Sequence, residues 1–136
     1  VPPGLVLAHR HPWHGPAAVP TLLKGQVAKY ETAVAKVQGI SPYDLINAEA
    51  AKSPVGANGV LFLPYLLGER APRWNPDATA AWLGLKMENQ RCDLFRAVLE
   101  GVTLNLNIIL ESFRKSIPID ELLVVGGGAK GASGAR

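Results

Sequence analysis

The residues with the clearest chemical potential are three consecutive glycines near the end of the chain, Gly126 to Gly128, followed by Ala129 and Lys130. Consecutive glycines let backbone N–H groups approach an anion closely, because no Cβ atom stands in the way. A helix after such a turn would add partial positive charge that favours phosphate. The run fits neither the dinucleotide fingerprint nor the P-loop, since Lys130 lacks the required Ser or Thr. It indicates a ligand-facing turn or, alternatively, a flexible turn or chain tail.

A second group of reactive side chains lies in a Pro-bounded polar stretch and consists of Glu69, Arg70, Arg73 and Asp77. A carboxylate beside a guanidinium could position a sugar hydroxyl or a phosphate. More often such a stretch is a solvated connection whose ion pairs hold its shape, and we favour that interpretation.

Histidine and cysteine offer weaker candidates. His9, His11 and His14 could suggest a metal site, because imidazole is a common metal ligand. Their segment has no cysteine and no nearby carboxylate, so we interpret them as loop histidines beside a packed tryptophan. Cys92 is the single cysteine, which excludes an intrachain disulfide and fits a reducing cytosol. Glu100 is interpreted as a surface or capping group.

Two helices are predicted in the first part of the chain. One covers 21–38 and ends at Gly39, which occupies the position of a C-cap glycine. Its apolar residues recur at three- and four-residue spacing on one face, at Leu23, Val27, Tyr30, Val34 and Val37. The other begins at the N-cap Ser41, with Pro42 at the first helical position, and stops before Pro54.

Three strands and a long helix are predicted further along. Strands are expected over 60–67, where Pro64 should break the ladder, over 81–87, and over 121–125 as a short buried strand before the glycines. A helix over about 90–115 has Asn89 as its candidate N-cap.

That long helix is apolar around much of its circumference, which predicts burial on several sides. Gly101 in its interior costs about 1 kcal/mol relative to alanine, so it predicts a close contact that a side chain would block.

Composition excludes several classes of protein. Hydrophobic residues make up 48% and charged residues 18% of the 136, the latter against a usual ~25%. The chain is therefore globular rather than disordered, and its under-charged surface is expected to be covered partly by another portion of a larger protein. No apolar run approaches the ~18 residues of a membrane span. The net charge is +3, but the basic residues are scattered, which argues against nucleic-acid binding.

Three sequence blocks together resemble the FGGY carbohydrate kinases, especially their xylulokinase-like branch. The first block runs from Gly59 to Pro72, and the third runs from Val124 to Lys130 and resembles the strand and Gly-rich turn of the family's adenosine motif. Between them, the family's C-terminal signature is matched by Ala80, Trp82, Gly84 and Leu85 and then, after seven residues, by Asp93, Leu94, Ala97, Val98, Leu99 and Glu100.

The resemblance implies an α/β fold of the ribonuclease-H-like, actin-like ATPase type, in which helices flank a mixed sheet. Family members have two such domains around a cleft. Residues 1–136 would be most of the C-terminal, nucleotide-side domain, without the N-terminal substrate domain.

The resemblance also implies ATP-dependent transfer of the γ-phosphoryl group to a sugar or polyol hydroxyl, with Mg²⁺ and with a ketopentose such as D-xylulose as the expected acceptor. The general-base aspartate is expected upstream of Val1, so the chain alone should be inactive. The residues expected to contact the adenosine and α-phosphate are Gly126, Gly127, Gly128 and Ala129, and Gly25 resembles a family glycine near the nucleotide.

The expected partners are therefore ATP and a sugar, with a possible homodimer, no nucleic acid and no membrane, in the cytoplasm. The alternative is a non-catalytic dimerisation or interaction module that keeps the kinase-like fold. It arises because the residues from Gly131 to Arg136 depart from the family's adenine-pocket pattern.

Overall fold

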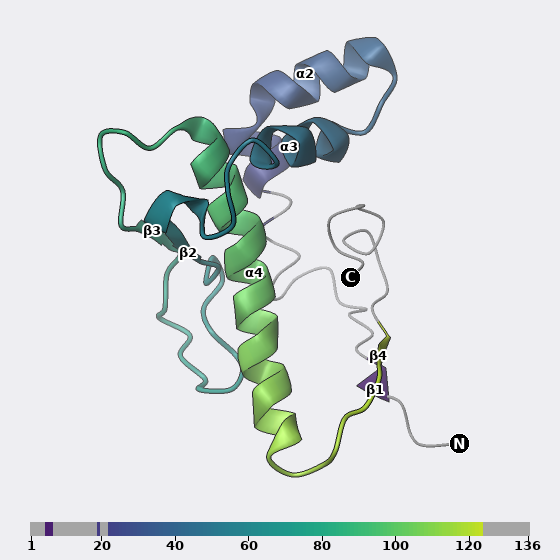
Figure 1. Ribbon diagram of the computed structural model, residues 1–136, viewed down its shortest axis with the longest axis vertical. Helices are drawn as coiled ribbons and strands as arrows, with labels where there is room; N and C mark the ends of the chain where they lie inside the picture. Colours follow the sequence, from purple (N-terminus) through teal and green to yellow (C-terminus); the bar gives the residue numbers. More distant parts are fainter. Residues whose placement is uncertain (1–4, 7–18, 20–21, 124–136) are drawn as a thin grey trace.

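The computed structural model of the chain describes residues 5–6, 19 and 22–123 (Figure 1). The long helix α4 (Arg91–Arg114) runs through the molecule, and helices α2 (Lys29–Gln38) and α3 (Pro42–Ala50) lie beside its N-terminal end. Two short strand pairs flank α4 on opposite sides in this view. The chain thus contains both helices and strands, as expected for an α/β fold.

The first predicted helix is divided into two pieces. A π-helical segment, η1 (Leu23–Val27), is followed at Ala28 by a break in the helical backbone and then by α2. The Thr32 hydroxyl donates to the Lys24 carbonyl at 2.8 Å and to the Ala28 carbonyl at 2.9 Å. The Ala28 carbonyl also accepts from the Thr32 N–H at 3.0 Å, so Thr32 ties the first turn of α2 to the residues at the break. The predicted left-handed cap at Gly39 is confirmed, with φ of 68°.

The apolar spacing implied that Tyr30 and Val37 of α2 are buried, and this is wrong for both residues. Tyr30 and Val37 are 70% and 88% exposed, whereas Glu31 and Ala35 are buried. The reason is a tertiary contact: the Arg91 guanidinium donates to the Glu31 carboxylate at 2.5 Å. This ion pair turns the polar edge of α2 toward the N-terminal end of α4, and Tyr30 and Val37 point outward, whereas Leu23 of the same predicted stripe is buried.

The start of α3 follows the sequence prediction. Ser41 is the N-cap, and its hydroxyl oxygen accepts from the Tyr43 N–H at 3.3 Å, with Pro42 at the first helical position. Ile46 and Ala50 face the core. Helix α3 therefore packs between α2 and α4 through one narrow apolar edge.

The described strands form two separate pairs. Strand β2 (Leu61–Leu63) is antiparallel to β3 (Ala81–Leu83), with Phe62 opposite Trp82. Strand β1 (Leu5–Val6) is parallel to β4 (Leu122–Leu123). The strand predicted over 60–67 ends before Pro64, which cannot donate to a ladder. Within the described residues the parallel and antiparallel pairs are not joined into one ladder.

The core lies where the N-terminal half of α4 meets β2, α3 and the 3₁₀ turn η2 (Ala57–Gly59). Phe62 and Phe95 are fully enclosed, and the Phe62 and Trp82 rings lie 4.7 Å apart between centroids at 47°. Helix α4 begins one residue later than predicted. Gln90 is its N-cap, while Asn89 accepts from the Lys86 N–H at 2.7 Å and so closes the preceding turn.

Gly101 of α4 lies directly against the Phe62 backbone, as its place in an apolar helix predicted. A Cβ atom added there would clash with the Phe62 carbonyl oxygen and approach the Phe62 carbonyl carbon at 3.0 Å. The missing side chain therefore sets the distance at which α4 crosses β2.

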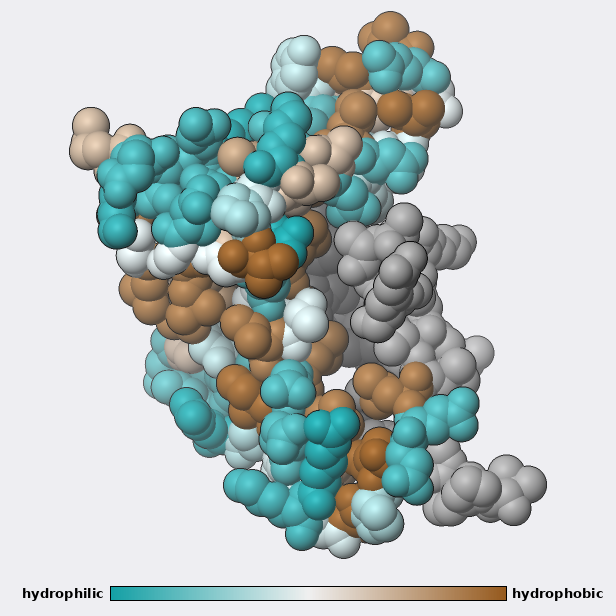
Figure 2. Space-filling view, in the orientation of Figure 1, coloured by the Kyte–Doolittle hydropathy of each residue, from teal (hydrophilic) through white to brown (hydrophobic). Residues whose placement is uncertain are grey.

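The C-terminal half of α4 does not have the predicted burial on several sides. Gly101 is the last buried residue of α4. The large apolar residues beyond it remain substantially exposed: Leu104, Leu106, Ile108 and Phe113. Hydrophobic side chains accordingly reach the surface along α4 and beside the β2–β3 pair (Figure 2). No helix in the described part of the chain has the length and apolar character needed to span a membrane.

Candidate functional site

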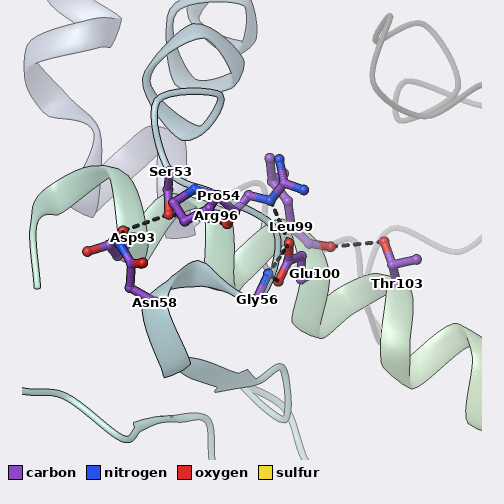
Figure 3. Close-up of polar contacts among 9 residues, drawn as sticks. All are labelled: Ser53, Pro54, Gly56, Asn58, Asp93, Arg96, Leu99, Glu100 and Thr103. Carbon is purple, nitrogen blue, oxygen red and sulfur yellow. Dashed lines mark hydrogen bonds and ion pairs between the residues drawn. The ribbon is translucent and has the colours of Figure 1, made fainter.

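A short loop between α3 and β2, residues 53–59, is held to α4 at two points (Figure 3). Asp93 holds its two ends, and Glu100 holds its middle. These two carboxylates lie seven residues apart, which places them on one face of the helix, two turns from one another. We call this arrangement the loop clamp.

At one attachment point of the loop clamp, the buried Asp93 carboxylate accepts from four oxygen and nitrogen donors, and the Cys92 thiol lies 3.9 Å from Oδ1. The Ser53 hydroxyl donates to Oδ1 at 2.6 Å and the Asn58 amide to Oδ1 at 2.9 Å. The Gln90 N–H donates to Oδ2 at 2.8 Å and the Asn89 amide to Oδ2 at 3.4 Å. Hydrogen bonds from Ser53 and the Gln90 backbone hold the pKa of Asp93 below its ordinary value of 3.8, because they favour the charged form.

At the second attachment point, the Gly56 N–H donates to Oε1 of Glu100 at 3.2 Å and to Oε2 at 3.1 Å. The Arg96 guanidinium donates to Oε1 of Glu100 at 2.5 Å. The loop needs this support because Gly56, Ala57, Asn58 and Gly59 all have positive φ, between 47° and 87°. Such a backbone is costly at Ala57, which carries a Cβ. Asp93 and Glu100 thus hold the loop. Glu100 was expected to be a surface or capping group, and it is instead a half-buried residue in the interior of α4 that binds the loop backbone.

The polar stretch from 68 to 77 is also held by backbone contacts. Glu69 is 6% exposed, and its carboxylate accepts from the Arg73 N–H at 3.2 Å. The Glu69 and Asn75 backbones exchange two hydrogen bonds of 2.7 Å. The Arg70 guanidinium lies 5.8 Å from the Trp74 ring centroid. This stretch is therefore a structural connection, as expected. The Glu69 carboxylate binds the backbone rather than forming the expected ion pair, so it is not placed for acid–base chemistry.

Gly25 lies in η1 at the edge of a hollow of about 530 Å³ between η1, α2 and α3. No atom lies within 4 Å of a Cβ built on Gly25, so the space beside it is open. The other lining residues are Lys24, Lys29, Thr32, Ala33, Lys36 and Tyr43. We call this feature the lysine hollow. Three of its lining residues are lysines.

The glycine turn that carries the other nucleotide expectation, Gly126, Gly127, Gly128 and Ala129, lies outside the described residues. The strand predicted just before it is present as β4. That strand was expected to be buried, and this is wrong for Leu122, whose residue is 41% exposed. Strand β1 pairs with β4 residue for residue, and such edge-to-edge pairing leaves the faces of a strand uncovered.

His9, His11 and His14 also lie outside the described residues. Across 5–6, 19 and 22–123, no three His, Cys, Asp or Glu side chains lie close enough together to hold a metal ion. Cys92 is a buried free thiol beside Asp93.

Sequence reasoning missed both partners of Asp93 in the loop, Ser53 and Asn58, and it missed the convergence of three lysines. The seven-residue spacing of Asp93 and Glu100 is a signal that could have predicted a contact along one helix face. The lysines come from two helical segments separated by a break at Ala28, so helix spacing alone does not bring them together.

Comparison with known proteins places this chain in one class. Residues 17–134 match the FGGY family of carbohydrate kinases, C-terminal domain, and the chain belongs to this family. Solved structures of its members share the actin-like ATPase fold that the sequence predicted.

Particular relatives are sugar kinases. A gluconokinase from Bacillus licheniformis is 38% identical over 110 residues, covering 79% of this chain and 21% of the relative. The crystal structure of xylulose kinase from Bifidobacterium adolescentis superposes with a TM-score of 0.63 at 35% identity, over 78% of this chain and 21% of that one. Plasmodium falciparum glycerol kinase with ADP has a TM-score of 0.58 at 30% identity, over 79% and 19%. The chain spans about a fifth of the length of these relatives.

Proposed function

We propose that this chain is the nucleotide-side part of an ATP-dependent carbohydrate kinase, which transfers the γ-phosphoryl group of ATP to a sugar or polyol hydroxyl. The observation that supports this most strongly is the family match over residues 17–134. The solved structure of Plasmodium falciparum glycerol kinase with ADP supports ATP as the donor. The phosphates of ATP would supply ligands to Mg²⁺, which neutralises charge on the transferred group.

The proposed nucleotide contacts are backbone groups of Gly126, Gly127, Gly128 and Ala129, with Gly25 as a further glycine near the nucleotide. The strand β4 that precedes the turn supports this proposal, because a strand directs the following N–H groups toward one edge. The general base is proposed to lie in the portion of the protein before Val1. The loop clamp would keep the 53–59 loop and α4 rigid, and it takes no part in proton transfer.

The proposed domain assignment is that residues 1–136 form most of a C-terminal domain whose remaining surface is covered in the intact protein. The exposed apolar side chains on the second half of α4 support this proposal. So does an apolar groove of about 290 Å³, in which Leu61 and Pro64 lie opposite Leu104 and Ile108. About four-fifths of the relative's length lies outside the matched part and could cover it. We also propose that the intact protein is cytoplasmic and forms a homodimer.

The proposed acceptor is a ketopentose such as D-xylulose, supported by the xylulose kinase structure. Gluconate is the second candidate, because the gluconokinase matches over 79% of this chain. A coupled assay of ADP release by the intact protein, with D-xylulose and with gluconate, tests both. We expect turnover with one acceptor and none from residues 1–136 alone.

Three results would count against parts of this proposal. Robust phosphorylation of either sugar by the 136-residue chain alone would refute the argument that the base lies elsewhere. Absence of ATP binding by the intact protein would favour the alternative of a non-catalytic interaction module. ATP binding without turnover on either sugar would reject both proposed acceptors while leaving the nucleotide site in place.

A further inference from the structure

The strand pair β2–β3 is apolar on both faces, but only one face is covered in the described part of the chain. On the inner face, Phe62 is fully enclosed and packs on Trp82. Successive side chains of a strand point to opposite faces, so Leu61 lies on the outer face. Leu83 of β3 is directly opposite Leu61, and the two residues are 48% and 40% exposed. Strands that are apolar on both faces are typical of sheets with a layer on each side, so the outer face indicates a second layer.

The outer face continues into the apolar groove beside the second half of α4. This groove has a volume of about 290 Å³, with Leu61 and Leu63 on one wall and Leu104 and Ile108 on the other. Leu104 and Ile108 are four residues apart, so they share one face of α4. Within the described part of the chain, every residue that lines the groove is uncharged.

The wall that α4 contributes lacks the charges expected of a helix surface in water. Residues 101–110 contain no acidic or basic side chain, although Leu104, Leu106 and Ile108 are between 42% and 51% exposed. A helix that faces water normally carries charged residues opposite its apolar stripe. An exposed apolar patch marks an interaction surface, and a charge placed in this groove would be desolvated without a partner. The occupant is therefore apolar on the side that enters the groove.

The surroundings of the groove favour a helix over a strand as the occupant. One wall is α4, whose backbone N–H and C=O groups are bonded within the helix. An extended segment in the groove could pair with β2 at most, and its other edge would lie unpaired against apolar side chains, which is costly. A helix satisfies its own backbone groups and binds such grooves through apolar side chains that repeat every three or four residues.

We propose that an amphipathic α-helix from the portion of the intact protein outside residues 1–136 lies in this groove and covers the outer face of β2–β3. About four-fifths of the matched gluconokinase lies outside the matched part, which is ample chain to supply the helix. The inference rests on the proposed domain assignment and names the element that completes it. With this helix in place, the β2–β3 pair lies between two helical layers, α4 being the other.

The first test is thiol labelling in a C92A background, which removes the chain's own cysteine. L104C places a thiol in the groove, whereas M87C places one on a fully exposed residue that does not line it. We expect the L104C thiol to react with Ellman's reagent at least about tenfold more slowly in the intact protein than in residues 1–136 alone, because the helix must open before the thiol can react. M87C should react at the same rate in both, and circular dichroism verifies folding. Equal rates for L104C in the two proteins would overturn the proposal.

The second test identifies the occupant by photo-crosslinking. A benzophenone side chain replaces Leu104 or, separately, Ile108 of the intact protein, and mass spectrometry maps the residues that it captures. The two positions are about 6 Å apart along α4, which corresponds to four residues of a neighbouring helix or two of a strand. We expect the captured residues to lie outside 1–136 in the same molecule, three or four positions apart.

Several crosslinking results would contradict the proposed helix. Captured residues two positions apart would indicate a strand, and capture within residues 1–136 or of a second copy of the protein would indicate a different occupant. Absence of any capture would show an empty groove. Neither labelling nor crosslinking depends on phosphoryl transfer, so this inference can fail while the coupled assay of ADP release succeeds, and the reverse.

Discussion

Replacing Gly101 with alanine should destabilise the chain, although alanine is the better helix former. The added methyl group would meet the Phe62 carbonyl group, which is main chain of β2 and cannot rotate away. Phe62 itself is enclosed and packed on Trp82, so the strand has little room to retreat. Overpacking of a close contact costs about 1–3 kcal/mol, and the backbone nature of this contact favours the upper part of that range.

The helix preference of alanine offsets about 1 kcal/mol of this cost, so the expected net loss in the free energy of unfolding is about 1–2 kcal/mol. Urea denaturation followed by circular dichroism at 222 nm measures it, with an unchanged dependence on urea concentration. G25A is the matched control, because the same methyl group there meets nothing within 4 Å. We expect G25A to be neutral or up to about 1 kcal/mol more stable. A G101A chain as stable as wild type would refute the close-packing argument.

Three further predictions concern the polar contacts of α4. E100A should lower the free energy of unfolding by about 1–2 kcal/mol, measured by urea denaturation, because the Gly56 N–H and Arg96 lose their acceptor. R91A should cost about 1–3 kcal/mol, because it leaves the Glu31 carboxylate buried without its partner; adding E31Q to R91A should recover part of the loss. Since the pKa of Asp93 is lower in the folded chain than its ordinary 3.8, its contribution to stability is present above about pH 4 and is lost as the pH falls through the folded value. The chain should therefore lose stability between pH 6 and pH 3, and D93N should be less stable at pH 6 but lose less over that interval in the same urea assay.

The exposed ion pair between Glu111 and Arg114 provides the control for these three predictions. E111A and R114A each remove one partner of an exposed ion pair on the same helix, and each should change stability by less than about 0.5 kcal/mol. An E100A effect no larger than that of E111A would show that the loop clamp does not depend on Glu100. An E31Q substitution that gives no recovery in R91A would argue against an uncompensated buried charge. Identical pH slopes for wild type and D93N would exclude Asp93 as the titrating group.

Local sequence signals predicted those parts of the fold that local chemistry determines. Ser41 and Pro42 start a helix through capping and a fixed φ, Gly39 ends one through a left-handed backbone, and Gly101 marks a close approach. Each of these roles depends on the residue type itself and hardly on the distant parts of the chain.

The buried face of α2 could not be predicted in the same way. Apolar spacing favoured Tyr30 and Val37, whereas the contact that orients the helix is between Glu31 and Arg91, which are 60 residues apart. A long-range ion pair of this kind leaves no periodic signal in the sequence of the helix. The same reasoning applies to the loop clamp, where Ser53 reaches Asp93 across 40 residues.

The exposed second half of α4 shows a different limit. Its apolar residues predicted burial on several sides, but periodicity does not say whether the surface that would cover them belongs to the same stretch of chain. For the candidate site, the resemblance predicts which glycines approach the nucleotide, but it did not indicate that Gly25 would share a surface with Lys24, Lys29 and Lys36. Lys29 and Lys36 lie in α2, whereas Lys24 lies in η1 on the other side of the break at Ala28.

The most direct measurement of the central claim is calorimetric titration of ATP into the intact protein, with G128V as the variant. The account predicts that the wild-type protein binds ATP and that a valine side chain at position 128 removes this binding, because it would stand between the nucleotide and the backbone N–H groups. Unaltered ATP affinity in G128V would contradict the account.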